Sequence, residues 1–138
     1  NLGEMTKLRR LFLGGPDPSD TNGGVANKIE ELPDLSRLHS LEELSVHDTK
    51  VRVLPGLPMA SLRALRLDRC PLTTDNFPEE LPAGLTTLHL EGCLLGGALE
   101  KPHELPEAVK RLKNLEDLQM PDGSHVGIFF GTPLQDQF

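Results

Sequence analysis

The chain has 138 residues, a formal net charge of −7 and a pI of about 5.2, with 37% hydrophobic and 25% charged residues. This length favours a single domain, and the 27 leucines argue against intrinsic disorder. The acidic balance argues against nucleic acid and anionic membrane surfaces as partners, because both recruit basic patches. Phe supplies all the aromatic residues, which make up only 4% of the chain, so the interior must be built from leucine.

A leucine motif, L-x-x-L-x-L, occurs five times, with Val46 and Met120 in place of the last leucine in two copies. The copies begin at residues 8, 41, 62, 85 and 115. Because one unit cannot bury its own leucine face, successive units are expected to stack and pair their strands in parallel. Each copy predicts one short strand, and the five expected strands lie near 8–13, 41–46, 62–67, 85–90 and 115–120.

The segments between these strands differ in character. Residues 14–27 are rich in Gly, Pro and Asp, which predicts an inserted surface loop. The three-residue spacing of apolar side chains from Ile29 to Leu38 predicts a helix. Residues 52–61 are too short and proline-rich for a helix, and residues 73–84 favour extended or 3₁₀ structure.

The last part of the chain predicts a helix and then a cap. Apolar residues at 105, 109 and 112 favour a helix with Pro106 at its first position and basic residues in its last turn. Residues 121–138 are expected to cover the last leucine layer with Val126, Ile128, Phe129 and Phe130; the alternative is that this tail docks on a partner. The chain does not begin with Met, and we expect it to be a fragment of a longer protein.

Further residues extend the motif. Cys70-x-Leu72 and Cys93-x-Leu95 follow two copies at the same offset, and Thr49-x-Val51 follows a third. Together these residues resemble the leucine-rich repeat (LRR) family, whose unit reads L-x-x-L-x-L-x-x-N/C-x-L, over about residues 2–122. The resemblance implies an α/β fold: a curved, right-handed solenoid with a parallel β-sheet on its concave face and short helices or 3₁₀ turns on its convex face. It also implies that the Cys and Thr side chains point inward and bond the turn backbone.

Two branches of the family share short phrases with this chain. Ile29-Glu-Glu-Leu-Pro33, Ser40-Leu-Glu-Glu-Leu44 and Leu81-Pro-Ala-Gly-Leu85 resemble the sensor region of plant intracellular immune receptors and the LRR part of secreted bacterial effectors. In both branches the repeats recognise or restrain while another domain acts. The resemblance therefore implies a non-catalytic protein–protein recognition module. The alternatives are the substrate-recognition part of an effector with a separate ubiquitin-ligase domain, and a structural subunit of a larger assembly.

The side chains between the motif leucines are expected on the solvent face of the sheet, because strand side chains alternate between faces. We expect a protein partner, or another domain of the same parent chain, to bind this concave face. Equivalent positions on successive strands form columns on this face, and these columns also include Gly14, Ala64 and Pro121. The candidate binding residues are Arg10, Phe12, Glu43, Ser45, His47, Arg66, Asp68, Thr87, His89, Glu91, Asp117 and Gln119.

Catalytic and metal chemistry find little support in the sequence. His47 and His89 lie two units apart, about 10 Å at one strand spacing per unit, which is too far for one zinc ion. No cofactor is expected, and no catalytic residue is assigned. Cys70 and Cys93 are expected to be buried, reduced thiols, although their predicted spacing of about 5 Å would permit a disulfide. The two thiols and the lack of an N-x-S/T site favour an intracellular setting, which for a secreted effector is the inside of a host cell.

Overall fold

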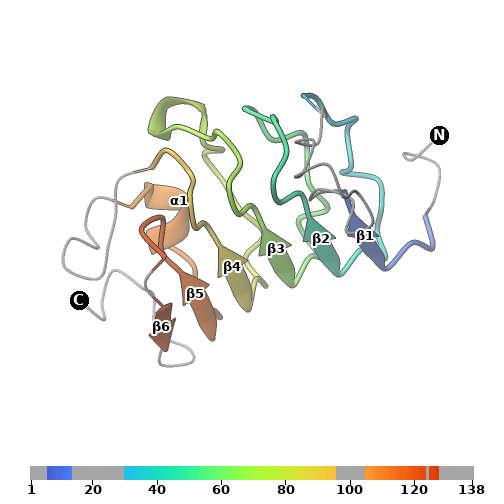
Figure 1. Ribbon diagram of the computed structural model, residues 1–138. Coiled ribbons are helices and arrows are strands. Elements are labelled where there is room, and N and C mark those ends of the chain that lie inside the picture. Colours follow the sequence, from blue (N-terminus) through green and yellow to red (C-terminus); the bar gives the residue numbers. More distant parts are fainter. Residues whose placement is uncertain (1–5, 14–29, 96–104, 124, 128–138) are drawn as a thin grey trace, which may run out of the picture.

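The computed structural model of the chain describes residues 6–13, 30–95, 105–123 and 125–127. Within these ranges six short strands lie side by side in chain order and form one sheet (Figure 1). The first five strands are parallel, as the motif predicts. They are β1 (Arg10–Phe12), β2 (Glu43–Ser45), β3 (Ala64–Arg66), β4 (Thr87–His89) and β5 (Asp117–Gln119).

The strand pairing places equivalent motif positions side by side. Leu11, Leu44, Leu65, Leu88 and Leu118 are direct partners from strand to strand. Backbone hydrogen bonds continue beyond the strands at both ends. Each strand is three residues long. Because backbone hydrogen bonds flank the strands, the pairing between neighbouring units extends through most of the motif.

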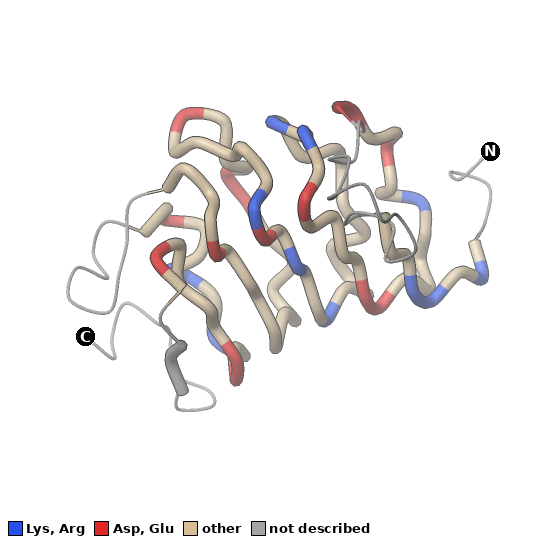
Figure 2. Tube along the Cα trace, viewed as in Figure 1, with Lys and Arg blue, Asp and Glu red and all other residues tan. Residues whose placement is uncertain are grey.

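Turns at the two ends of the strands form two rims of the sheet. We call the rim formed by the turns that precede the strands the amino-end rim. Lys7, Arg9 and Arg63 lie in the turns before β1 and β3. Figure 2 shows blue Lys and Arg segments along the lower edge of the view, with red Asp and Glu segments between them. Glu42, before β2, lies between Arg9 and Arg63 in this rim. The turns before β1 to β3 thus carry three basic residues and one acidic residue, Glu42, in a chain of net charge −7.

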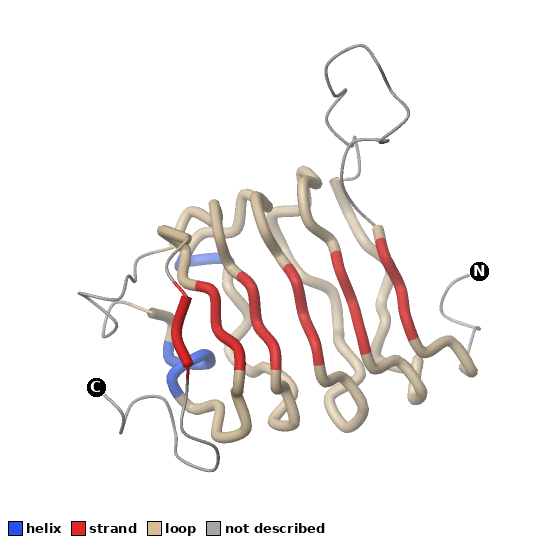
Figure 3. Tube along the Cα trace, turned by 60° about the horizontal axis from the view of Figure 1, so that its bottom comes forward, coloured by secondary structure: helices blue, strands red, loops and turns tan. Residues whose placement is uncertain are grey.

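The core lies behind the sheet, where the rest of each unit returns (Figure 3). The central leucines of β2 to β5 are 0% exposed and that of β1 is 9% exposed. The first and last positions of the motif are also fully buried in the copies that begin at residues 41, 62, 85 and 115. The leucine spacing thus places three side chains per unit in one common interior, which each unit shares with its neighbours.

The return segments contain little helix. A 3₁₀ turn, η2 (Thr74–Asn76), confirms the expectation for 73–84, and Thr73 Oγ1 accepts a hydrogen bond from the Asn76 N–H at 3.3 Å. A single α-helical turn, α1 (Glu107–Lys110), lies where a helix was predicted. Pro106 is its N-cap rather than its first helical residue. Residues 52–61 form no helix, as expected.

The predicted helix at 29–38 is wrong over its described part. Residues 30–35 have no regular secondary structure, and a turn follows. The backbone N–H of Leu35 donates to the carbonyl of Gly56 in the next unit at 2.9 Å, so it makes no helical bond. Asp34 closes the turn by accepting hydrogen bonds from the N–H and the hydroxyl of Ser36. The apolar spacing does place Leu35 and Leu38 in the core, on an irregular backbone.

The sheet ends in a strand that the motif does not predict. β6 (His125–Gly127) pairs with β5 in the antiparallel direction, with Val126 opposite Leu118. This strand covers the outer backbone edge of β5 from within the segment expected to be a cap. The other proposed cap residues, Ile128, Phe129 and Phe130, and the predicted loop at 14–27 lie outside the described residues.

Candidate binding face

The side chains of β1 to β5 that point away from the core form one surface, which we call the binding face. It comprises the candidate residues of the sequence and the turn residues that follow each strand. Phe12 is its most exposed large apolar side chain, at 59%. Arg66 is half-buried and lies beside His89, which in turn lies beside Gln119. The register thus places residues that are 21 to 33 positions apart in the sequence side by side on neighbouring strands.

Three positions of the predicted columns are buried, which corrects the expectation of uniform exposure. Ser45 is 2% exposed, Ala64 is 6% exposed, and Pro121 is also buried. Ser45 is a small side chain paired between Phe12 and Arg66, and a hydrogen bond of 2.7 Å joins its Oγ to His47 Nδ1. Longer neighbours therefore cover the small side chains, and Ser45 is removed from the surface available to a partner. Gly14 lies outside the described residues.

Polar contacts across the strands fix several side chains of the binding face. His89 Nε2 lies 3.0 Å from Asp117 Oδ2, and Gln119 Nε2 donates to Glu91 at 3.1 Å. Arg10 forms a longer ion pair of 3.7 Å with Glu43. Each pair joins neighbouring units, so the face presents a network that is largely ordered before any partner arrives.

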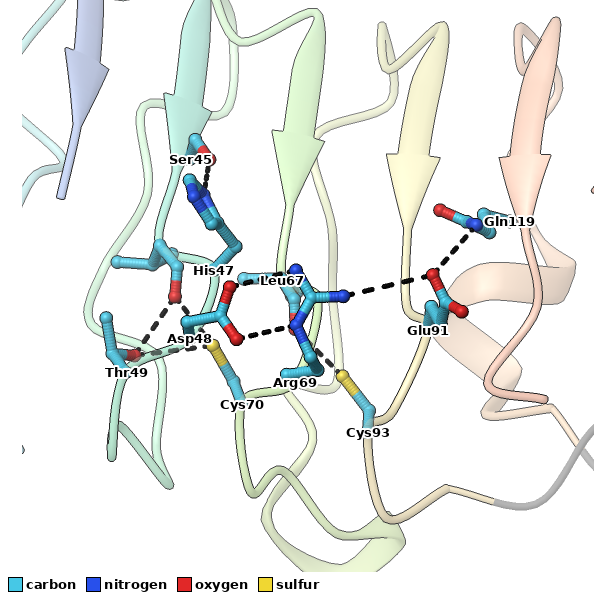
Figure 4. Close-up of polar contacts among 11 residues, drawn as sticks. Ser45, His47, Asp48, Thr49, Leu67, Arg69, Cys70, Glu91, Cys93 and Gln119 are labelled. Carbon is cyan, nitrogen blue, oxygen red and sulfur yellow. Dashed lines mark hydrogen bonds and ion pairs between the residues drawn. The ribbon is translucent and has the colours of Figure 1, made fainter. Parts of the chain in front are cut away.

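Arg69 is a central residue of this network that the sequence analysis missed (Figure 4). Its Nε and Nη2 donate to the two carboxylate oxygens of Asp48 at 2.6 and 2.8 Å, and its Nη1 lies 3.9 Å from Glu91. The guanidinium therefore bridges the turns that follow β2 and β4. These hydrogen bonds lower the pKa of Asp48, which keeps that carboxylate charged. A bidentate pair of this kind fixes both side chains in direction as well as distance.

The backbone explains why Arg69 reaches both carboxylates. Asp48 and Arg69 have positive φ angles of 57° and 58°, and Gly92 has the equivalent position in the next unit with φ of 79°. The sequence signal was the common offset of these residues from Leu44, Leu65 and Leu88, four positions after each. A left-handed residue at this point turns the chain sharply, and its N–H pairs with the next turn.

Asp68 is the most unusual group on the binding face. Its Oδ1 is buried and has no hydrogen-bond partner within the described residues. Burial raises the pKa of this carboxyl, while His89, Arg69 and His47 nearby lower it and Glu91 raises it. The carboxylate thus lies among charged and titratable groups from three neighbouring units, with one acceptor unsatisfied.

Cys70 and Cys93 are buried free thiols, as expected. Their sulfurs donate to the carbonyl oxygens of Val46 and Leu67, at 2.7 and 3.0 Å, in the preceding units. Thr49 bonds the Val46 carbonyl as well, at 3.0 Å. Burial raises the pKa of Cys70 and raises that of Cys93 to about 12, so neither supplies a thiolate near neutral pH. Their role in the described structure is to satisfy turn carbonyls.

The described ranges contain no group of three or more His, Cys, Asp or Glu side chains arranged to hold a metal ion. The same ranges contain no helix with the length and apolar character needed to cross a membrane.

Comparisons with protein-family models, with curated proteins and with solved structures found no match to this chain.

Proposed function

We propose that the chain is a leucine-rich-repeat solenoid and acts as a non-catalytic recognition module that binds a protein through the binding face. The repeat assignment is supported by the five motif copies whose centres pair in register. It is also supported by the slot occupied by Thr49, Cys70 and Cys93, whose side chains all bond a carbonyl at the turn.

The observation that carries the binding proposal is the composition of the exposed face. Phe12 on β1 presents an aromatic ring to solvent, and Arg66 lies two strands away on β3. Carboxylates held in ion pairs lie on other strands of the face and in the turns that follow the strands. Aromatic and arginine side chains are the usual energetic centres of protein interfaces. Because the ion pairs of this face already order its side chains, a partner would lose less conformational entropy in binding here.

The same residues argue against catalysis at this face. The Ser45 hydroxyl bonds His47, which is one element of an activated nucleophile, but Ser45 is only 2% exposed. The cysteines are buried and protonated. The described nucleophile candidates therefore lack access to a substrate, and recognition is the function that the face supports best.

The test is a quantitative pull-down with the intact chain, the double variant Phe12→Ala with Arg66→Glu, and Arg111→Glu as a control. Arg111 is exposed behind the sheet, at the end of α1, so its reversal tests for nonspecific charge effects. We expect the double variant to lose partners at least about fivefold, which corresponds to about 1 kcal/mol. Equal capture by all three proteins would contradict the proposal, provided that circular dichroism shows each to be folded.

A further inference from the structure

A hollow of about 440 Å³ opens on the amino-end rim, outside the binding face. We call it the amino-end hollow, and it lies between the turns that precede β1, β2 and β3. None of its lining residues belongs to the binding face. They are Lys7, Arg9, His39, Ser40, Glu42, Ala60, Ser61 and Arg63. We infer that this hollow binds an acidic peptide segment of a protein partner.

The amino-end hollow is lined mainly by basic side chains. The lining contains three cations and one carboxylate, in a chain whose net charge is −7. Glu42 is already engaged, because Arg9 Nε donates to it at 2.8 Å and lowers its pKa. Lys7 and Arg63 have no carboxylate at ion-pair distance within the described ranges. A negatively charged segment would therefore meet two cations that form no ion pair within the described residues, although the charge of Arg63 also contributes to the lowered pKa of Glu42.

The charged residues of the hollow are spaced by the strands that they precede. Arg9, Glu42 and Arg63 occupy equivalent positions, one residue before each strand, and the carbonyls of Arg9 and Glu42 accept the N–H groups of the next unit. Arg9 and Arg63 are therefore two strand spacings apart, about 10 Å between backbones. In an extended peptide, carboxylates at i and i+2 lie about 7 Å apart, within reach of two flexible arginine side chains. Cations that stem from backbones about 10 Å apart match the repeated carboxylates of an acidic peptide better than the single charge centre of one phosphate group.

The Arg63 side chain of the hollow extends over a glycine of the next unit. Its guanidinium lies against Gly84 in the next unit, and a Cβ added at Gly84 would collide with Arg63 Nη1. The absence of a side chain at residue 84 thus leaves room for the Arg63 guanidinium over the turn of the next unit. This offers a variant that displaces the cation while leaving the charge of the protein unchanged.

The experiment uses fluorescence anisotropy of a labelled octaglutamate peptide at low salt. The intact chain is compared with Lys7→Glu plus Arg63→Glu, and with Lys50→Glu plus Arg52→Glu as a matched control. Lys50 and Arg52 are exposed and lie on the opposite rim, away from the hollow. Because the control also replaces two cations by two glutamates, it makes the same change in net charge. We expect the first pair to weaken binding about tenfold or more and the control to change it less than about twofold. Gly84→Ala should weaken binding about threefold at unchanged charge.

Two further probes separate this proposal from its rivals. An eight-nucleotide single strand that binds more tightly than the peptide would overturn the assignment, and so would displacement of the peptide by inorganic phosphate at equal concentration. Equal weakening by the two charge-reversal pairs would reduce the effect to net charge and also overturn it. The variants leave Phe12 and Arg66 intact, so failure here is distinguishable from failure of the binding face.

Discussion

Among single residues, Asp68 is a carboxylate whose burial we expect to lower the stability of the folded chain. Its Oδ1 is buried without a hydrogen-bond partner among the described residues, and burial raises its pKa above the ordinary value of 3.8. An acid whose folded pKa is raised destabilises the folded state when ionised, and this cost disappears as the pH falls through the folded pKa. Asp68→Asn should therefore raise the melting temperature by a few degrees at pH 7.5, and the gain should shrink towards pH 4.

Glu80→Gln is the control for Asp68→Asn, since Glu80 is exposed and lies away from the binding face. Differential scanning calorimetry at both pH values measures the effect. A lower melting temperature for Asp68→Asn at pH 7.5 would show that the ionised carboxylate is stabilising. If the same variant also weakens partner capture, Asp68 is retained for recognition at the expense of stability.

Gly92 is a position where the backbone requires glycine. Its φ of 79° is left-handed, and an added Cβ would lie 2.8 Å from Arg69 Cγ and 3.2 Å from Arg69 Cα. Gly92→Ala should lower the free energy of unfolding by about 1–3 kcal/mol, which urea unfolding measures. Gly84→Ala is the matched control, because there the added methyl meets only the end of the flexible Arg63 side chain. Equal losses in the two variants would contradict this explanation.

At the scale of elements, the pair Asp48–Arg69 fastens the turn after β2 to the turn after β3. A double-mutant cycle with Asp48→Ala and Arg69→Ala should give a coupling of about 0.5–1 kcal/mol at pH 7, because both groups are partly exposed to solvent. The pKa of Asp48 is lowered in the folded state, so its contribution is present above pH 3.8 and is lost as the pH falls through the folded value. Urea unfolding at pH 7 and pH 2.5 measures both terms, and a coupling that persists unchanged at pH 2.5 would exclude the ion pair as its source.

The elements also show what the sequence can and cannot predict. The strands and their leucine core follow from spacing alone, because a motif with three buried positions has one consistent arrangement. The three-residue spacing of Leu32, Leu35 and Leu38 is compatible with a helix and also with an irregular segment. The structure has the irregular segment, in which the Leu35 N–H bonds the carbonyl of Gly56 in the next unit instead of a carbonyl within a helix.

Some features of the candidate site also follow from the sequence, whereas others depend on the folded structure. Column membership was predictable from strand alternation, and Phe12 is exposed as that alternation requires. The burial of Ser45 depends on the size of its neighbours in the register and on its bond to His47. The bridging role of Arg69 depends on a left-handed backbone and on two carboxylates from other units. Such information exists only once the units are stacked.

At the scale of the whole molecule, two surfaces with different chemistry lie on one scaffold. The binding face offers an aromatic ring and ordered ion pairs, whereas the amino-end hollow offers cations at the ends of three neighbouring turns. Both surfaces belong to the same stack of units, which fixes their positions relative to each other. A partner with an acidic segment beside its main contact would therefore be able to engage both surfaces at once. Linked contacts of this kind raise overall affinity well beyond either one alone.

The reactivity of the two cysteine thiols reports whether the stacked units unfold together. Cys70 and Cys93 bond carbonyls of the preceding units, and their unit-to-unit contacts belong to a single hydrophobic cluster that runs from Leu11 to Met120. We expect iodoacetamide at pH 8 to leave both thiols unmodified in the native protein, since burial raises both pKa values and blocks access. In rising urea both should become reactive at the same midpoint, matching the loss of circular dichroism, because a short stack with one shared core unfolds cooperatively. Single-cysteine variants, Cys70→Ala and Cys93→Ala, assign the labelling to each site. Reaction of one thiol at a clearly lower urea concentration would show that the units open separately and that the core is not a single cooperative structure.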